Sequence, residues 1–93
     1  MKDLNKLDLH DSTLESIKFN WIKQTTELTL KTSSGSTLIT FFECNDLHIP
    51  AENPWGKSIS INTTVQRDNT FEIEMQSGDI ISIKFTSFEV IQS

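Results

Sequence analysis

Apolar and polar residues alternate with a period of two along most of this chain, and this alternation constrains its fold more than any other feature. It is clearest in the second half, where Phe71, Ile73 and Met75 alternate with Glu72 and Glu74. A period of two places successive side chains on opposite faces of a β-strand, so each such segment predicts one buried and one solvated face. The sequence therefore predicts an all-β protein.

Short polar links, Arg67–Asn69 and Ser77–Asp79, separate three alternating segments in the second half. Links of this length join antiparallel neighbours, because a parallel connection needs a dozen or more residues. Residues 57–86 therefore predict a three-stranded antiparallel meander. In its first strand the alternation assigns four residues to the buried face: Ile59, Ile61, Thr63 and Val65.

The first half of the chain predicts a hairpin that turns at Lys23–Thr25, with Trp21 in phase with the apolar residues of its first strand. Ser12–Glu15 fits a helix capping box, but alternation follows at once, so a strand start is predicted there. Residues 37–42 are apolar on both parities, which predicts an interior strand that is covered on both faces or carries a bulge. Residues 88–91 predict a last short strand.

These segments give one domain over residues 1–93, with about six to eight mainly antiparallel strands in a sandwich or a partly open barrel. The alternation leaves both architectures open. The predicted core contains Ile17, Phe19, Leu28, Leu30, Leu38, Ile59, Ile61, Phe71, Ile73, Ile81, Ile83 and Phe85.

The charge and cysteine content exclude several classes of function. The chain carries 13 acidic against 8 basic residues, a net charge of −5, which disfavours binding to nucleic-acid phosphates. No apolar run approaches the ~20 residues that span a bilayer, and the first residues lack the apolar core of a signal peptide. The single cysteine, Cys44, excludes an intrachain disulfide and fits a reducing cytoplasm, where we expect it to be a small buried side chain.

His10, Asp11 and Ser12 are the residue types of a hydrolase triad, but three consecutive residues of an extended chain point to alternate sides. We therefore expect structural roles: Asp11 and Ser12 bonded to nearby backbone N–H groups, and His10 donating to a carbonyl. No ligand pair has metal-site spacing and no cofactor motif is present. The sequence predicts no catalytic residue, no metal and no cofactor.

Residues 46–57 form the longest stretch without alternation and contain both prolines and Trp55. Loops of this length in small domains are frequently functional, so Pro54, Trp55 and Gly56 are candidate binding residues. The alternative is that Trp55 folds back as a plug over one end of the sheets. These two interpretations carry equal weight.

Glu72 and Glu74 share the solvated face of one predicted strand, with Asp68 and Asp79 in the flanking turns. A solvated face is the ordinary explanation of such a cluster. It would also suit a basic partner protein, so both glutamates are candidate binding residues.

Two stretches, Leu9–Ile17 and Asn53–Ile61, together resemble small bacterial domains with an H-D-x-x-L-x-x-I opening and a P-W-G-x-S-x-x-I segment. They are also similar to β-rich immunity-protein families of polymorphic toxin systems. The resemblance implies a cytoplasmic bacterial protein that binds another protein. It transfers no catalytic residue and marks only five positions as characteristic: His10, Asp11, Pro54, Trp55 and Gly56. His10 and Asp11 are therefore candidate binding residues as well.

The sequence thus predicts a non-catalytic protein-binding module with a basic partner, in its finer form an immunity-type protein that neutralises a toxin. Two alternatives stay open: a small enzyme with its site at a homodimer interface, and a small-ligand or carbohydrate binder built on Trp21 or Trp55. Both prolines lie within residues 46–57, so the edge strands lack them and a homodimer is expected.

Overall fold

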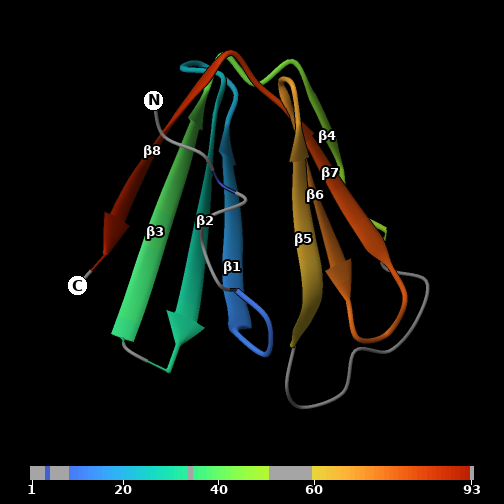
Figure 1. The fold of residues 1–93 in the computed structure, drawn as a ribbon. Helices are drawn as coiled ribbons and strands as arrows, with labels where there is room; N and C mark the ends of the chain where they lie inside the picture. The colour runs from blue at the N-terminus through green and yellow to red at the C-terminus, as the bar shows by residue number, and fades with distance from the viewer. Residues whose placement is uncertain (1–3, 5–8, 34, 51–59, 93) are drawn as a thin grey trace.

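The computed structural model describes residues 4, 9–33, 35–50 and 60–92. They form eight strands: β1 (Thr13–Asn20), β2 (Thr25–Thr32), β3 (Gly35–Phe42), β4 (Asp46–His48), β5 (Ile61–Arg67), β6 (Thr70–Met75), β7 (Ile80–Lys84) and β8 (Ser87–Gln92). The first sheet has the order β1-β2-β3-β8 and the second the order β4-β7-β6-β5, and all pairs are antiparallel (Figure 1). The all-β prediction is confirmed.

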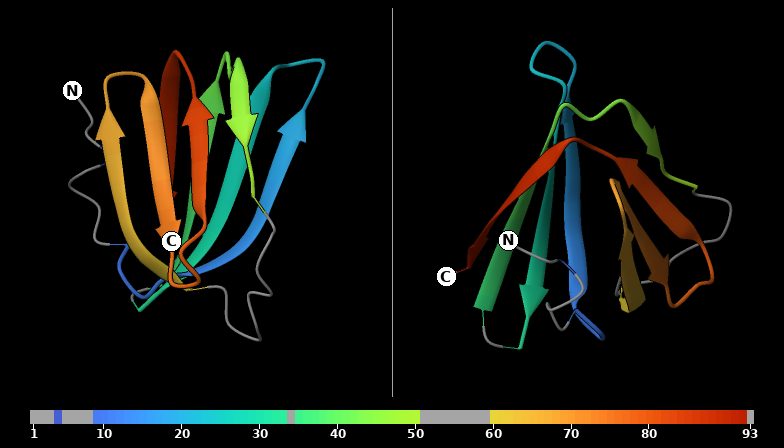
Figure 2. Two further views of the ribbon diagram at one scale, coloured as in Figure 1. Left: turned by 90° about the vertical axis from the view of Figure 1, so that its right-hand side faces the viewer. Right: turned by 45° about the horizontal axis from the view of Figure 1, so that its top comes forward.

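The two sheets lie face to face as a sandwich (Figure 2). Besides the pairing within the two sheets, the described residues contain one isolated bridge, in which Thr13 at the start of β1 pairs with Ser60 just before β5. A barrel would need a continuous ladder at this corner, so the sandwich is the architecture that forms. The predicted meander is confirmed as β5, β6 and β7, with Gly78 at a φ of 99° in the turn between β6 and β7, where a side chain would be strained.

Aromatic rings connect the sheets at the centre of the core. Phe41 on β3 lies 5.7 Å from Phe71 on β6 and 4.8 Å from Phe85, measured between ring centroids. Offset aromatic pairs at these distances stabilise a core beyond the area they bury. The interior therefore holds the two sheets together through side chains of both.

Most of the predicted core is buried. Eight predicted residues are fully buried: Leu28, Leu30, Ile61, Phe71, Ile73, Ile81, Ile83 and Phe85. Ile17, Phe19 and Leu38 are half-buried, and Ile59 lies outside the described residues. The core also includes Leu4, Leu9, Leu14, Ile39, Phe41, Cys44 and Met75. The prediction that Cys44 is a buried thiol is confirmed.

The predicted buried face of β5 is wrong beyond its first residue, because the register shifts between Ile61 and Thr63. This bulge at Asn62 reverses the orientation of the following residues. Thr64 and Gln66 pair with the buried Ile73 and Phe71 and share their inner face. Thr63 and Val65, which alternation assigned to the core, lie instead on the outer face of the second sheet.

A second bulge lies between Leu14 and Ser16 on β1. The extra residue, Glu15, lets both Leu14 and Ile17 point inward although they are three positions apart. β3 pairs regularly and has no bulge, and it is interior as predicted, between β2 and β8. On its outer face Ser36 is exposed and Leu38, Thr40 and Phe42 are half-buried, so the prediction of cover on both faces or of a bulge is wrong: β3 is regular and is buried on one face.

Two other boundaries differ from the prediction. β1 ends at Asn20, so Trp21 belongs to the turn before β2 and not to the strand. Part of the predicted 46–57 loop is ordered as β4, which pairs with β7. The predictions for Pro54, Trp55 and Gly56 concern residues outside the described ranges.

Candidate functional site

His10, Asp11 and Ser12 form a corner that joins β1 to the start of β5, and we call these three residues the His10 corner. The Asp11 N–H donates to the Ile61 carbonyl at 2.8 Å, and the Ile61 N–H donates to the Ser12 carbonyl at 2.9 Å. Paired bonds of this kind satisfy backbone groups at a strand edge that water would otherwise have to solvate. The corner therefore continues the strand pairing from one sheet toward the other.

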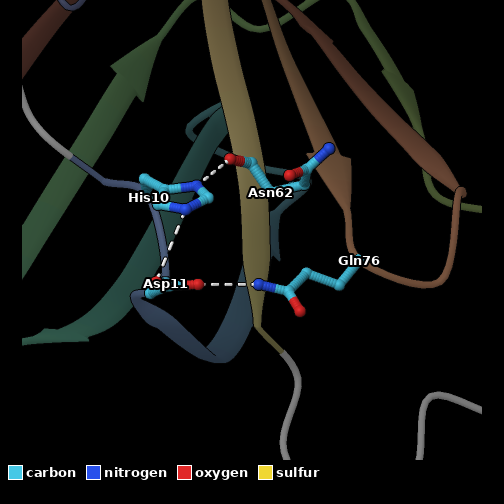
Figure 3. A network of polar contacts seen from close by, with 4 residues as sticks. All are labelled: His10, Asp11, Asn62 and Gln76. Atoms are coloured by element: carbon cyan, nitrogen blue, oxygen red, sulfur yellow. Dashed lines mark hydrogen bonds and ion pairs between the residues drawn. The ribbon is translucent and has the colours of Figure 1, made fainter.

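The side chains of His10 and Asp11 contact β5 and the turn after β6 (Figure 3). His10 Nδ1 bonds the Asn62 carbonyl, which can only accept, so the ring donates there. Asp11 Oδ1 accepts a hydrogen bond of 2.8 Å from the Gln76 amide, and Asp11 Oδ2 lies 3.4 Å from His10 Nε2. The predicted His10 bond to a carbonyl is confirmed. The Asp11 carboxylate binds a side-chain amide where a backbone N–H was expected.

Asp11 is held at a φ of 64°, a conformation that aspartate and asparagine tolerate better than most residues. Ser12 is buried, whereas the His10 and Asp11 side chains are exposed. The two His10 ring nitrogens already face a carbonyl and a carboxylate. His10 and Asp11 therefore connect the start of β1 to β5 and to the turn after β6.

Glu72 and Glu74 lie on the outer face of the second sheet, where their cross-strand neighbours on β5 are Val65 and Thr63. With Arg67 and the half-exposed Ile80 these residues line a shallow hollow of about 330 Å³. Lys84 belongs to the same face through its pairing with Thr70. The face therefore mixes both signs of charge around two half-buried carboxylates.

Asp79 does not extend this acidic face. It is 8% exposed, and its carboxylate accepts a hydrogen bond of 3.1 Å from the Ser77 hydroxyl. Its backbone carbonyl accepts from the Met75 N–H at 2.9 Å. Asp79 therefore shapes the turn between β6 and β7.

The most exposed apolar side chains lie in the turn between β1 and β2, residues 21–24, which we call the Trp21 turn. Trp21 is 83% and Ile22 96% exposed. Asn20 Oδ1 accepts hydrogen bonds of 3.0 Å from the N–H groups of Ile22 and Lys23, an Asx turn that fixes the backbone. The turn projects beyond the rest of the ribbon (Figure 2, right). Two large apolar side chains are thus held in solvent by an ordered turn.

A groove of about 450 Å³ adjoins the Trp21 turn and is lined by Phe19, Trp21, Gln24 and residues 44–47. Two contacts hold the residues that line this groove in place. The Trp21 ring meets the Phe19 ring edge-on, with centroids 4.6 Å apart, and the Cys44 N–H donates to the Gln24 carbonyl at 2.8 Å. Asp46 and Asn45 bring exposed polar side chains to its rim. The groove therefore combines an exposed indole with a carboxylate and two amides.

Sequence alternation missed this surface because it counted Trp21 as part of a strand. The available signal was the position of Trp21 and Ile22 next to a hairpin link, where apolar side chains have no core to enter. Within the described ranges, no three His, Cys, Asp or Glu side chains gather as metal ligands would. His48 is exposed on β4, whereas Cys44 is buried.

Comparison with known proteins gives no relative: the chain matches no family model, and no curated protein or solved structure matches it significantly. The described part of the chain has no helix with the length and apolar character that a membrane crossing requires.

Proposed function

We propose that the protein is a non-catalytic protein-binding module and that it docks through the Trp21 turn and the adjoining groove. The observation that carries the proposal is the exposure of Trp21 and Ile22, at 83% and 96%, on a turn whose backbone is fixed by Asn20. Tryptophan dominates the binding energy of many interfaces when it enters a partner pocket. A pre-ordered turn also reduces the entropy lost on binding.

The proposed partner is a protein that is basic around the pocket receiving Trp21. The chain carries a net charge of −5; exposed Asp46, the first residue of β4, lines the groove, and exposed Glu43 precedes the groove residue Cys44. Complementary charge accelerates association and orients the encounter. The finer form of the proposal, neutralisation of a toxin by an immunity-type protein, is supported by the resemblance of the Leu9–Ile17 and Asn53–Ile61 segments.

The test begins with capture of partners on immobilised wild-type protein, followed by calorimetry with the purified partner. Trp21→Ala should weaken the complex by about 2 kcal/mol or more. Ile80→Ala is the matched variant on the other candidate surface, because Ile80 is also exposed and apolar but lines the hollow of Glu72 and Glu74; docking through the Trp21 turn predicts no effect there. This variant should bind as the wild type does.

Unchanged affinity in both Trp21→Ala and Ile22→Ala would contradict docking through this turn. Replacing both Glu72 and Glu74 with Gln separates the two candidate surfaces. If those glutamates contact the partner, the double variant should slow association at low salt and leave dissociation largely unchanged. A hydrolase activity that disappears when His10 is replaced would contradict the non-catalytic part of the proposal.

A small-ligand or carbohydrate binder is the second candidate, and the groove beside Trp21 favours it. Gln24, Asn45 and Asp46 place amide and carboxylate groups next to an exposed indole. An aromatic face with a few polar groups is the usual composition of a small-molecule site. Quenching or enhancement of tryptophan fluorescence by oligosaccharides, lost in Trp21→Phe and Asn45→Ala, would support this candidate over a protein partner.

A further inference from the structure

The four strands at the sheet edges differ in how their unpaired backbone groups are protected. β4 is three residues long. β1 carries a bulge and the charged Lys18, and its start is bridged to Ser60. Short strands, bulges and lysines are the devices by which proteins prevent edge-to-edge pairing.

β5 is protected by its own bulge and by the His10 corner. Asp11 and Ser12 bond the backbone of Ile61, and His10 occupies the carbonyl of Asn62. β8 has none of these devices within the described residues. Its sequence, SFEVIQ, contains no proline or lysine, and it pairs with β3 without a register shift. Figure 1 shows it as the outermost strand of the first sheet, on the side away from β1.

β8 also carries apolar side chains that its own sheet leaves partly uncovered. Phe88 and Val90 are half-buried on the inner face, and Ile91 is 55% exposed on the outer face beside Leu38 of β3. Among the described residues, β8 has a strand partner, β3, on one side only. A strand added along its other side would cover parts of all three side chains and would pair with the outward N–H and C=O groups. The edge is therefore suited to receive an antiparallel strand of similar composition.

We propose that β8 pairs with β8 of a second copy of this chain around a two-fold axis, so that the first sheets of two copies form one continuous eight-stranded sheet. This inference is independent of the proposed function. Since β1 and β8 are opposite edges of the first sheet, the Trp21 turns stay free in the dimer.

Charge selects the register of this pairing. An axis at Glu89 would place the two Glu89 carboxylates opposite each other, which is unfavourable. An axis at Val90 pairs residues 88–92 of each copy, with Glu89 opposite Ile91 and Phe88 opposite Gln92. This register uses nearly the whole strand without facing like charges, as a self-complementary interface requires.

A charge series at position 91, followed by sedimentation equilibrium over a range of concentrations, tests the proposal. The wild type should be a dimer. Ile91→Glu creates two Glu–Glu pairs across the axis and should weaken dimerisation about tenfold or more, whereas Ile91→Lys places opposite charges there and should retain the dimer. Ile80→Glu changes the net charge equally on the second sheet and should also stay dimeric. Circular dichroism confirms that each variant is folded.

A wild-type protein that stays monomeric at every concentration measured would overturn the proposal. Equal loss of the dimer in Ile91→Glu and Ile80→Glu would also overturn it. Equal loss in Ile91→Glu and Ile91→Lys would overturn the register. Hydrogen exchange of the wild-type protein gives an answer that needs no variant. Protection that rises with concentration should be confined to β8 amides, and a rise at the Trp21 turn instead would place the interface elsewhere.

Discussion

At the two ends of β1, side chains depart from the usual rule that polar groups face solvent and apolar groups face the protein interior. Before the strand, the polar His10 and Asp11 bond inward to β5 and to the turn after β6. After the strand, the apolar Trp21 and Ile22 point into solvent. The polar residues at one end therefore maintain the fold, while the apolar residues at the other end are available for binding. The polar motif that stands out in the sequence thus has its contacts within the fold, whereas the exposed surface is apolar.

The largest expected effect on stability comes from comparing two isoleucines, one beside the His10 corner and one in the Trp21 turn. Ile61 is fully buried against the His10 corner. Ile61→Ala should lower the free energy of unfolding by about 2–5 kcal/mol, because apolar burial is lost and a cavity is left behind. Ile22→Ala should change stability by less than about 0.5 kcal/mol, because the side chain is 96% exposed. Urea denaturation measures both. Similar losses in the two variants would show that Ile22 packs in solution and would remove the contrast.

The next effect separates the backbone from the side chain at the His10 corner. Asp11→Ala loses the bond to Gln76 and puts alanine, which tolerates the left-handed region less well than aspartate, at a φ of 64°, which should cost about 1–2 kcal/mol. Asp11→Gly relieves the backbone and should cost less, and Asp11→Asn keeps both the acceptor and the tolerated φ. Thermal and urea unfolding should therefore rank the variants Asn, Gly, Ala from most to least stable. An Asn variant as unstable as Ala would assign the effect to the carboxylate charge.

The smallest stability effect is expected at the Trp21 turn. Asn20→Ala removes the acceptor of the Ile22 and Lys23 N–H groups and should cost about 1 kcal/mol or less, since both bonds are exposed. Its effect on partner binding should be larger than on stability, because the turn loses its fixed conformation. Asn20→Asp keeps the acceptor and serves as the control. Calorimetry with the partner and NMR relaxation of the Trp21 backbone amide check both parts.

The sequence by itself determined the fold class, the meander of β5 to β7 and most of the buried residues. These follow from alternation, which is a local property: a strand that buries one face must repeat apolar residues every two positions. It also predicted that His10 bonds a backbone carbonyl, an ordinary interaction for a polar side chain at the entrance to a strand.

Only the tertiary structure decided the register and the surfaces. The bulges at Glu15 and Asn62 each reverse the orientation of a strand, and their positions depend on the partner strands and on the bridge between Thr13 and Ser60. The exposure of Trp21 depends on where β1 stops pairing with β2, which its apolar character does not reveal. The free edge at β8 exists because β8 joins β3 across a long span of sequence. Alternation specifies which residues need a buried face, but the choice of neighbouring strand is made by long-range pairing.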